Sequence, residues 1–226
     1  MSRINIIIEE KYFVKDPLSS DLGKRILKES IVMLDELGYE QFTFKKLASQ
    51  IQSTEASIYR YFDNKLRLLI YLTTWYWAWV DYRIDYETHF LKDPRKKLKR
   101  IWEIVCHVNI NDTMELPLDL SRLRSVVVSE SDKTYLTKQV DEINREGLFR
   151  GFKELCHKIA QEVLAVNPNY PHSHTLVTTM LESAHQQPFF ANHLPSLTEV
   201  HSMPDKSSNV QVCEFIDNSV MKLITQ

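Results

Sequence analysis

The chain has 226 residues, enough for one large core or for a small and a larger domain. Its formal net charge at pH 7 is −2, which excludes a protein that is basic throughout but leaves room for a basic patch on one face. The three cysteines have no CxxC spacing, so they indicate neither a disulfide framework nor a zinc knuckle, and reduced thiols in a cytoplasm are the simplest interpretation.

The N-terminal 18 residues are expected to form a short strand or an arm that ends at Pro17. Their apolar run, Ile6 to Ile8, is too short for a signal peptide, and no stretch of the chain approaches the length of a membrane span. The rest of the chain contains few glycines and has apolar residues at helical spacing. We therefore predict an all-α, cytoplasmic protein that does not interact with a membrane.

Three short helices are predicted between residues 19 and 64. Gly38 stops the first helix, and Asp63-Asn64 ends the third. The residues that can cap their N-termini are Ser19, Ser20 and Asp21 for the first, Thr43 for the second, and Ser53 and Thr54 for the third. Three short helices joined by tight turns have the outline of a helix-turn-helix unit, in which the second helix of the pair enters the DNA major groove.

A long helix is predicted from about Lys65 to Phe90, followed by a helical bundle. Asp93 can cap a helix and Pro94 suits its first position, so a helix is predicted from here to about Val108. Later helices are expected from Pro117, from Asp132, over about 142–165, over 173–187 and over 210–224, with a turn at 167–171 and a loop at 194–209. The predicted organisation is an arm (1–18), a helix-turn-helix domain (19–64) and a larger helical domain for effector binding and dimerisation (65–226).

The third predicted helix has a polar face opposite Ile58. Small side chains on this face, Ala56 and Ser57, would let the backbone approach base edges, where a hydroxyl can hydrogen-bond and a methyl group can contact thymine. Tyrosine hydroxyls and a lysine at the next helix start suit phosphate oxygens. The alternative is a solvated face without a partner. The residues predicted to contact DNA are Thr43, Lys45, Thr54, Glu55, Ala56, Ser57, Tyr59, Arg60, Tyr61 and Lys65.

The order of short motifs in this region is specific. Leu37-Gly38-Tyr39 follows the first helix, Phe42-Thr43 and Leu47-Ala48 mark the second, and Ser57-Ile58-Tyr59-Arg60-Tyr61-Phe62 precedes Lys65 and Leu68-Leu69. From Lys24 to Leu69 the chain thereby resembles the TetR family of bacterial one-component repressors. Two positions depart from the family pattern, since a usual turn glycine falls at Gln52 and an often basic position is Glu55.

This resemblance implies a regulator, most simply a repressor, that binds double-stranded operator DNA as a homodimer. It also implies a small-molecule effector and no enzymatic activity. In the family, two late helices pack against their symmetry mates, and here the expected pair lies near 142–165 and 173–190. The long helix after Lys65 links the DNA-binding domain to the effector pocket in that family.

An aromatic stripe on the long helix is the candidate effector site. Aromatic side chains with polar tips can line an amphipathic cavity for a flat or mainly apolar ligand. A densely packed aromatic core is the competing interpretation. The predicted ligand-binding residues are Trp75, Trp79, Tyr82, Tyr86, Trp102, Cys106 and Met114.

Two other functional classes remain open. One is a helical lipid- or ligand-binding protein with a vestigial DNA-binding domain. The other is a di-metal bundle enzyme built on two Glu-x-x-His spacings, Glu154 with His157 and Glu182 with His185. Helical periodicity places both pairs away from the apolar stripes of their helices, which argues against a buried metal site. No nucleotide-binding glycine motif or Ser/His/Asp arrangement is present, so no metal and no cofactor is expected.

Overall fold

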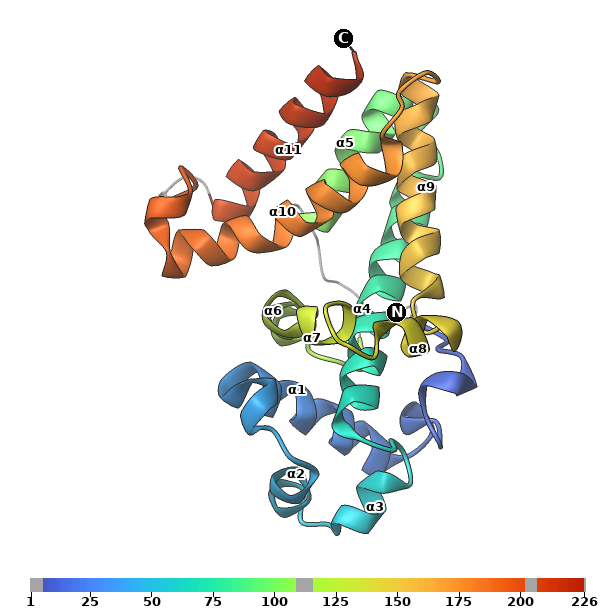
Figure 1. The fold of residues 1–226 in the computed structure, drawn as a ribbon, viewed down its shortest axis with the longest axis vertical. Helices are drawn as coiled ribbons and strands as arrows, with labels where there is room; N and C mark the ends of the chain where they lie inside the picture. Colours follow the sequence, from blue (N-terminus) through green and yellow to red (C-terminus); the bar gives the residue numbers. More distant parts are fainter. Residues whose placement is uncertain (1–5, 109–115, 202–206, 226) are drawn as a thin grey trace. The chain divides into compact units, whose positions relative to one another are not determined.

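A computed structural model describes residues 6–108, 116–201 and 207–225 (Figure 1). Helices and turns make up these ranges and no strand occurs in them, which confirms the all-α class. None of the described helices has the length and apolar character needed to cross a membrane. The chain divides into two compact units, Met1–Trp79 with Asp112–Gly151 and Val80–Asn111 with Phe152–Gln226. The helix-turn-helix segment is thus part of a larger unit than residues 19–64.

The first unit contains the arm, the short N-terminal helices and a later helical layer. Residues 1–18 were expected to form a short strand or an arm, and their described part forms two short 3-10 turns, η1 (Glu10–Tyr12) and η2 (Pro17–Ser19), and no strand. The α-helices of this unit are α1 (Asp21–Gln41), α2 (Phe44–Gln50), α3 (Glu55–Tyr59), the N-terminal part of α4 (Lys65–Thr88), α6 (Leu120–Glu130), α7 (Asp132–Tyr135) and α8 (Val140–Arg145).

Helix starts in this unit follow the predicted capping residues. The Ser20 hydroxyl accepts from the Gly23 N–H, and the Thr43 hydroxyl accepts from the Lys46 N–H. Each side chain satisfies a donor that the first turn of a helix cannot pair internally. The start of α6 was predicted incorrectly, because Asp119 rather than Pro117 provides the cap.

Contacts between α1 and α6 hold the first unit together. The carboxylate of Glu130, 9% exposed, accepts from the Tyr39 N–H at 3.1 Å. This bond lies just after Gly38, whose φ of 74° interrupts α1 without ending it. Arg122 on α6 pairs with Asp35 on α1 at 3.1 Å. The C-terminal end of α1 is therefore fixed by a buried acceptor and an ion pair on α6.

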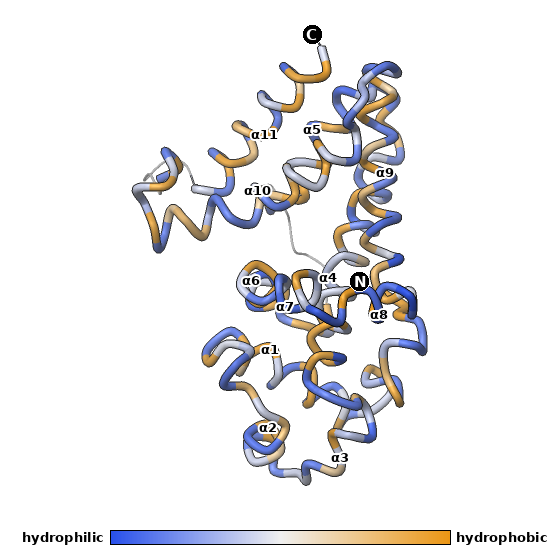
Figure 2. The backbone as a smooth tube through the Cα atoms, viewed as in Figure 1, coloured by the Kyte–Doolittle hydropathy of each residue, from blue (hydrophilic) through white to orange (hydrophobic). Residues whose placement is uncertain are grey.

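The second unit contains the later helices and the C-terminal part of α4. Its helices are α5 (Pro94–Val105), α9 (Arg150–Val166), α10 (Ser173–His193), η3 (Pro195–Leu197) and α11 (Ser208–Ile224). Hydrophilic and hydrophobic residues alternate along α9 and α11, as expected of helices buried on one side only (Figure 2). Arg83 and Arg100 share the carboxylate of Glu87, so the C-terminal half of α4 is joined to α5 by paired charges.

Two helix boundaries differ from the sequence prediction. The helix expected over 142–165 is two helices, because Gly147 with a φ of 75° separates α8 from α9. The helix expected to end at Gln187 continues to His193 through Pro188. Proline lacks an N–H and usually interrupts a helix, but α10 continues beyond it.

Candidate functional site

The turn between α2 and α3 sets the orientation of the candidate recognition helix. Gln52 adopts the left-handed conformation, with a φ of 51°, at the position where the family pattern has glycine. Thr54 then caps α3, accepting from the Ser57 N–H at 3.2 Å, and its hydroxyl lies 2.8 Å from the Ser57 hydroxyl. The left-handed residue reverses the chain and the cap starts the helix immediately afterwards.

Helix α3 is anchored by one buried side chain and exposes the rest of its surface. Ile58 is fully buried, while Ser57 is half-buried. The exposed positions are Thr54, Glu55, Ala56, Tyr59 and Arg60. The face predicted to meet base edges is accordingly open, with small side chains at its centre.

Tyr59 is held in place by its neighbours on α2 and α3. Its ring packs edge-on against Phe44, with ring centres 5.2 Å apart, and 47% of the side chain remains exposed. Its hydroxyl donates to the Glu55 carboxylate at 3.4 Å. A phosphate at this position would compete with Glu55 for the tyrosine hydroxyl, so the acidic side chain bears directly on DNA affinity.

The structure corrects the expected role of Tyr61. Its side chain is 3% exposed, and its hydroxyl lies 2.8 Å from the Ser20 hydroxyl. The Val14 N–H donates to the Tyr61 carbonyl at 2.8 Å. Tyr61 is thus bound by the N-terminal arm and the start of α1, and its hydroxyl is not presented to a phosphate. No local sequence signal identifies these partners, because they lie about forty residues earlier in the chain.

Lys65 also has intramolecular partners. Its ammonium group donates to the Tyr39 carbonyl at 2.9 Å and to the Phe42 carbonyl at 3.4 Å, and it lies 4.2 Å from the centre of the Tyr39 ring. A cation at the carbonyl end of a helix satisfies unpaired acceptors and the helix dipole. Lys65 therefore stabilises the end of α1, and its predicted contact with phosphate stays a prediction.

Other cations of the N-terminal helices remain at the surface. Lys45 and Arg60 are exposed, as is the Thr43 cap. Lys46 donates to the Gln41 carbonyl at 2.9 Å. The exposed basic residues of α1 are Lys24, Arg25 and Lys28. Exposed positive charges are therefore present on α1, on α2 and at the end of α3.

The tryptophans predicted to bind a ligand lie in the interior. Trp75, Trp79 and Trp102 are at most 1% exposed, and Cys106 is fully buried. Within the described residues, the indole N–H groups of Trp75 and Trp102 have no hydrogen-bond acceptor. A buried donor without an acceptor is costly, so each indole N–H is a point where an acceptor atom from a ligand or water would be stabilising.

Tyr82 and Tyr86 are found at the surface rather than in the interior. They are 37% and 61% exposed, and their rings stack on each other with centres 6.1 Å apart. Met114, also predicted to bind a ligand, lies outside the described residues. The predicted aromatic stripe is therefore split between buried tryptophans and an exposed tyrosine pair.

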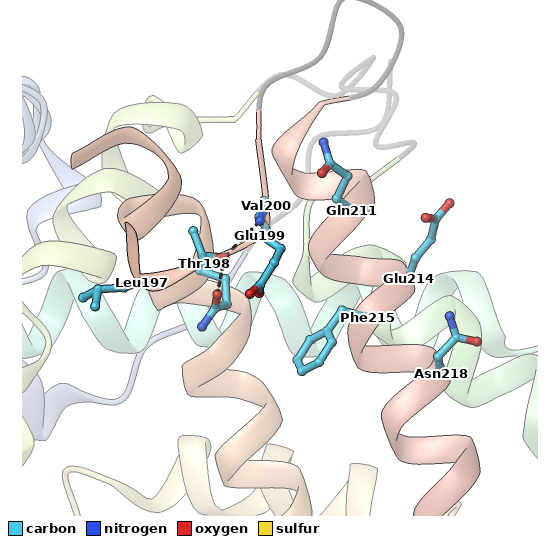
Figure 3. A pocket seen from close by; sticks show the side chains of 9 residues that line it. Leu197, Thr198, Glu199, Val200, Gln211, Glu214, Phe215 and Asn218 are labelled. Carbon is cyan, nitrogen blue, oxygen red and sulfur yellow. Dashed lines mark hydrogen bonds between the residues drawn. The ribbon is translucent and has the colours of Figure 1, made fainter. Parts of the chain in front are cut away.

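The described residues of the second unit enclose cavities, of which we consider a smaller and a larger one. One, of about 460 Å³, lies among α4, α5 and α9, where Lys158 pairs with Asp85 at 2.8 Å and Lys97 with Glu162 at 3.0 Å. The other, of about 610 Å³, lies between the segment 197–200 and α11 and is shown in Figure 3. Phe215 contributes its aromatic ring, and Glu199 and Glu214 contribute carboxylates. Neither cavity was predicted from the amino-acid pattern.

The two Glu-x-x-His spacings do not combine into a metal site. His157 lies 3.1 Å from His174, nitrogen to nitrogen, rather than near the second pair. His185 is 3% exposed, so the expectation that it points away from the core is wrong, whereas Glu182 is exposed. The described part of the chain contains no cluster of three or more metal-ligating side chains.

The N-terminal region matches a known family. Residues 26–72 match the family model described as bacterial regulatory proteins, tetR family. The matched segment runs from α1 through α3 into α4 and includes the exposed face of α3. A comparison with curated protein sequences found no match.

Solved structures of low sequence identity share the fold over nearly the whole chain. A transcriptional regulator from Rhodococcus sp. Rha1 is 12% identical, with a TM-score of 0.63 over 92% of this chain and 97% of that one. AibR in complex with isovaleryl coenzyme A and operator DNA is 12% identical, with a TM-score of 0.59 over 87% and 97%. A regulator from Saccharomonospora viridis in complex with choline is 14% identical, with a TM-score of 0.58 over 90% and 95%.

Proposed function

Starting from the tetR-type helix-turn-helix region at residues 26–72, we propose that this chain is a ligand-responsive transcriptional regulator. It acts as a repressor that binds operator DNA as a homodimer and is released by a small effector. The observation that carries this proposal is the face of α3, which is exposed at Ala56 and Arg60 while Ile58 anchors the helix. A helix fixed in this way can enter a major groove without rearrangement.

The test of DNA binding uses the DNA upstream of the chain's own gene. Fluorescence anisotropy should show tighter binding to this DNA than to a scrambled sequence of equal length at low salt. Ala56→Glu places a second carboxylate on the exposed face and should reduce binding at least tenfold. Gln161→Glu, at an exposed position of α9, is the matched control and should bind normally. Equal binding to both DNAs would contradict the assignment.

The effector is expected to be mainly apolar and to carry hydrogen-bond acceptors. In the second unit, the buried ring of Trp102 would supply apolar surface, and an acceptor atom of the effector would meet its unpaired indole N–H. Structural relatives bind choline and isovaleryl coenzyme A, so the shared fold accommodates small ligands of different chemistry. Short-chain acyl thioesters are therefore the first probes to titrate against the protein–DNA complex.

Substitution of Trp102 tests the effector site. Trp102→Phe keeps an aromatic ring but removes the N–H, so it should weaken the response to an active probe about fivefold while DNA affinity is retained. Tyr86→Phe, at the exposed tyrosine pair, is the control. An unchanged response in Trp102→Phe would remove this residue from the effector site.

The homodimer is proposed to form through α10 and α11. Helix α10 contains no lysine or arginine, and Phe189 on it is 39% exposed. On α11, Phe215 is 52% exposed. The range 142–165, which was expected to contribute, has no large apolar side chain among those that are exposed. Interface cores are depleted of charge and enriched in aromatic residues, which favours α10 and α11.

One observation favours the alternative of a ligand-binding protein with a vestigial DNA domain. Glu55 is exposed on the candidate recognition face, and Tyr61 and Lys65 are occupied by contacts within the protein. This alternative predicts effector binding without affinity for any upstream DNA. The anisotropy measurement at low salt distinguishes the two functions directly.

A further inference from the structure

Two cysteines from distant parts of the sequence meet between α5 and α11. Cys106 ends α5 and Cys213 lies on α11, and these two helices pack against each other within the second unit. The two thiols are joined by a hydrogen bond. Both side chains are buried, and both are in the reduced form. Two thiols in direct contact are the reactants that a disulfide requires.

The end of α5 fixes the backbone on both sides of the Cys106 thiol. The His107 N–H donates to the Ile104 carbonyl at 3.0 Å. The Val108 N–H donates to the Glu103 carbonyl at 2.8 Å. His107 is left-handed, with a φ of 57°, and this combination of bonds closes a helix after its last turn. Cys106 is therefore presented to α11 from a defined backbone position.

The two thiols differ in burial. Cys106 is fully buried, whereas Cys213 is 6% exposed, next to Val212 and one turn before Ile216 on the buried face of α11. A small oxidant therefore reaches Cys213 first. The hydrogen bond from Cys106 lowers the pKa of Cys213, although burial and nearby carboxylates oppose this effect. A lower pKa raises the fraction of thiolate, which is the nucleophilic form.

The third cysteine has the opposite character. Cys156 lies on α9, and burial raises its pKa to about 12, with a smaller contribution from the charge of Glu182. It remains protonated at neutral pH, and a buried protonated thiol is unreactive. Cys156 is thus an internal control for the other two cysteines.

We propose that Cys106 and Cys213 form a dithiol site for hydroperoxides, at which oxidation joins α5 to α11 by a disulfide. The Cys213 thiolate attacks one oxygen of hydrogen peroxide, the O–O bond breaks, and a sulfenic acid forms as the thiol proton leaves with the first water. The Cys106 thiol then attacks the sulfenic sulfur, so that an S–S bond replaces the S–O bond and the second water leaves. Two thiols are oxidised and one peroxide is reduced to two waters. This site does not depend on the function proposed above.

Peptide mass spectrometry of the full chain tests the site. Reduced protein is treated with hydrogen peroxide at neutral pH and then denatured in iodoacetamide, which alkylates the remaining thiols. The number of alkylated cysteines should fall from three to one, and the peptide containing Cys106 should be linked to the peptide containing Cys213. Dithiothreitol should restore all three thiols. Cys156→Ser is the matched control and should form the same linked peptides.

Serine variants test the order of the two steps. Cys213→Ser should leave Cys106 unmodified by peroxide. Cys106→Ser should stop the reaction at the sulfenic acid of Cys213, which dimedone traps. Circular dichroism establishes that each variant is folded, and the wild-type measurement decides the proposal even where a variant is not. Three alkylated cysteines after peroxide treatment, a disulfide that includes Cys156, or a crosslink between two chains would each overturn it.

Discussion

At the scale of single residues, Gln52 has the clearest energetic consequence. Its φ of 51° lies in the left-handed region, where a side chain costs about 1–2 kcal/mol that glycine avoids. The side chain is exposed, so little packing is lost on its removal. Gln52→Gly should raise the free energy of unfolding in urea by about 0.5–1 kcal/mol, after the greater entropy of glycine in the unfolded chain is subtracted. Gln52→Ala keeps the strain and should leave stability unchanged, and a stabilised Ala variant would refute this explanation.

Two lysines near the candidate DNA face should separate stability from binding. Lys65→Met removes the bonds to the Tyr39 and Phe42 carbonyls, and we expect it to lower the free energy of unfolding by about 1 kcal/mol. Lys45→Met removes an exposed charge and should leave stability unchanged. Instead it should lower the salt dependence of DNA binding by about one charge. Urea unfolding and anisotropy at several salt concentrations measure the two effects, and an identical pattern in both variants would contradict the distinction.

The candidate site could be predicted from sequence only where its determinants are local. The orientation of Ile58 and the cap at Thr54 follow from helical periodicity and residue type within one turn. The burial of Tyr61 depends on Ser20 and on the arm, which come together only in the folded chain. Tyr82 lies at helical spacing from Trp75 and Trp79, but this spacing does not indicate which turns of the helix other helices cover, and Tyr82 is exposed.

At the scale of helices, two glycines near the break between α8 and α9 can be compared, one in the break and one inside α9. Gly147 has a φ of 75°, and a methyl group added there would lie 3.3 Å from the Lys11 ammonium. Gly151 lies in α9, and nothing within 4 Å would meet an added methyl group. Gly147→Ala should therefore lower the free energy of unfolding by about 1–2 kcal/mol. Gly151→Ala should raise it by up to about 1 kcal/mol, because alanine is the better helix former.

Thermal or urea unfolding of these two variants measures the difference. If both variants changed stability in the same direction, the positive φ at Gly147 would not be the reason that the helix is interrupted. Both variants replace glycine by alanine, at positions four residues apart. The effect of alanine on the entropy of the unfolded chain is therefore nearly the same in both and largely cancels in the comparison.

Helix starts could be predicted better than helix ends and interruptions. Thr43 and Asp93 cap α2 and α5 as expected, because a capping side chain bonds to backbone only two or three residues away. The separation of α8 from α9 and the passage of α10 through Pro188 depend on packing that no short window contains. The all-α class was nevertheless predictable, since periodicity over the whole chain outweighs errors at individual boundaries.

At the scale of the whole molecule, α4 is the element through which the proposed effector would act on DNA binding. Its residues up to Trp79 belong to the first unit and the remainder to the second. We expect the proposed effector near Trp102 and an operator at α3 to influence each other through this helix, because α4 continues from one unit into the other. If the two ligands prefer different arrangements, each weakens the other by the same factor, of about 5- to 150-fold for a coupling of 1–3 kcal/mol.

The last prediction concerns alkaline pH, which acts on groups buried in both units. Burial raises the pKa of Cys156 to about 12, with a smaller contribution from the charge of Glu182, and burial also raises the pKa of Tyr71. The unfolded chain releases the thiol proton near pH 8.5, so above that value the native state binds more protons and stability falls as pH rises. Between pH 8 and pH 9.5 the free energy of unfolding should decrease by about 1 kcal/mol through Cys156. Cys156→Ala removes this contribution, and urea unfolding should show a smaller decrease over the same interval. An equal decrease in the variant and the wild type would show that Cys156 ionises normally in the folded protein.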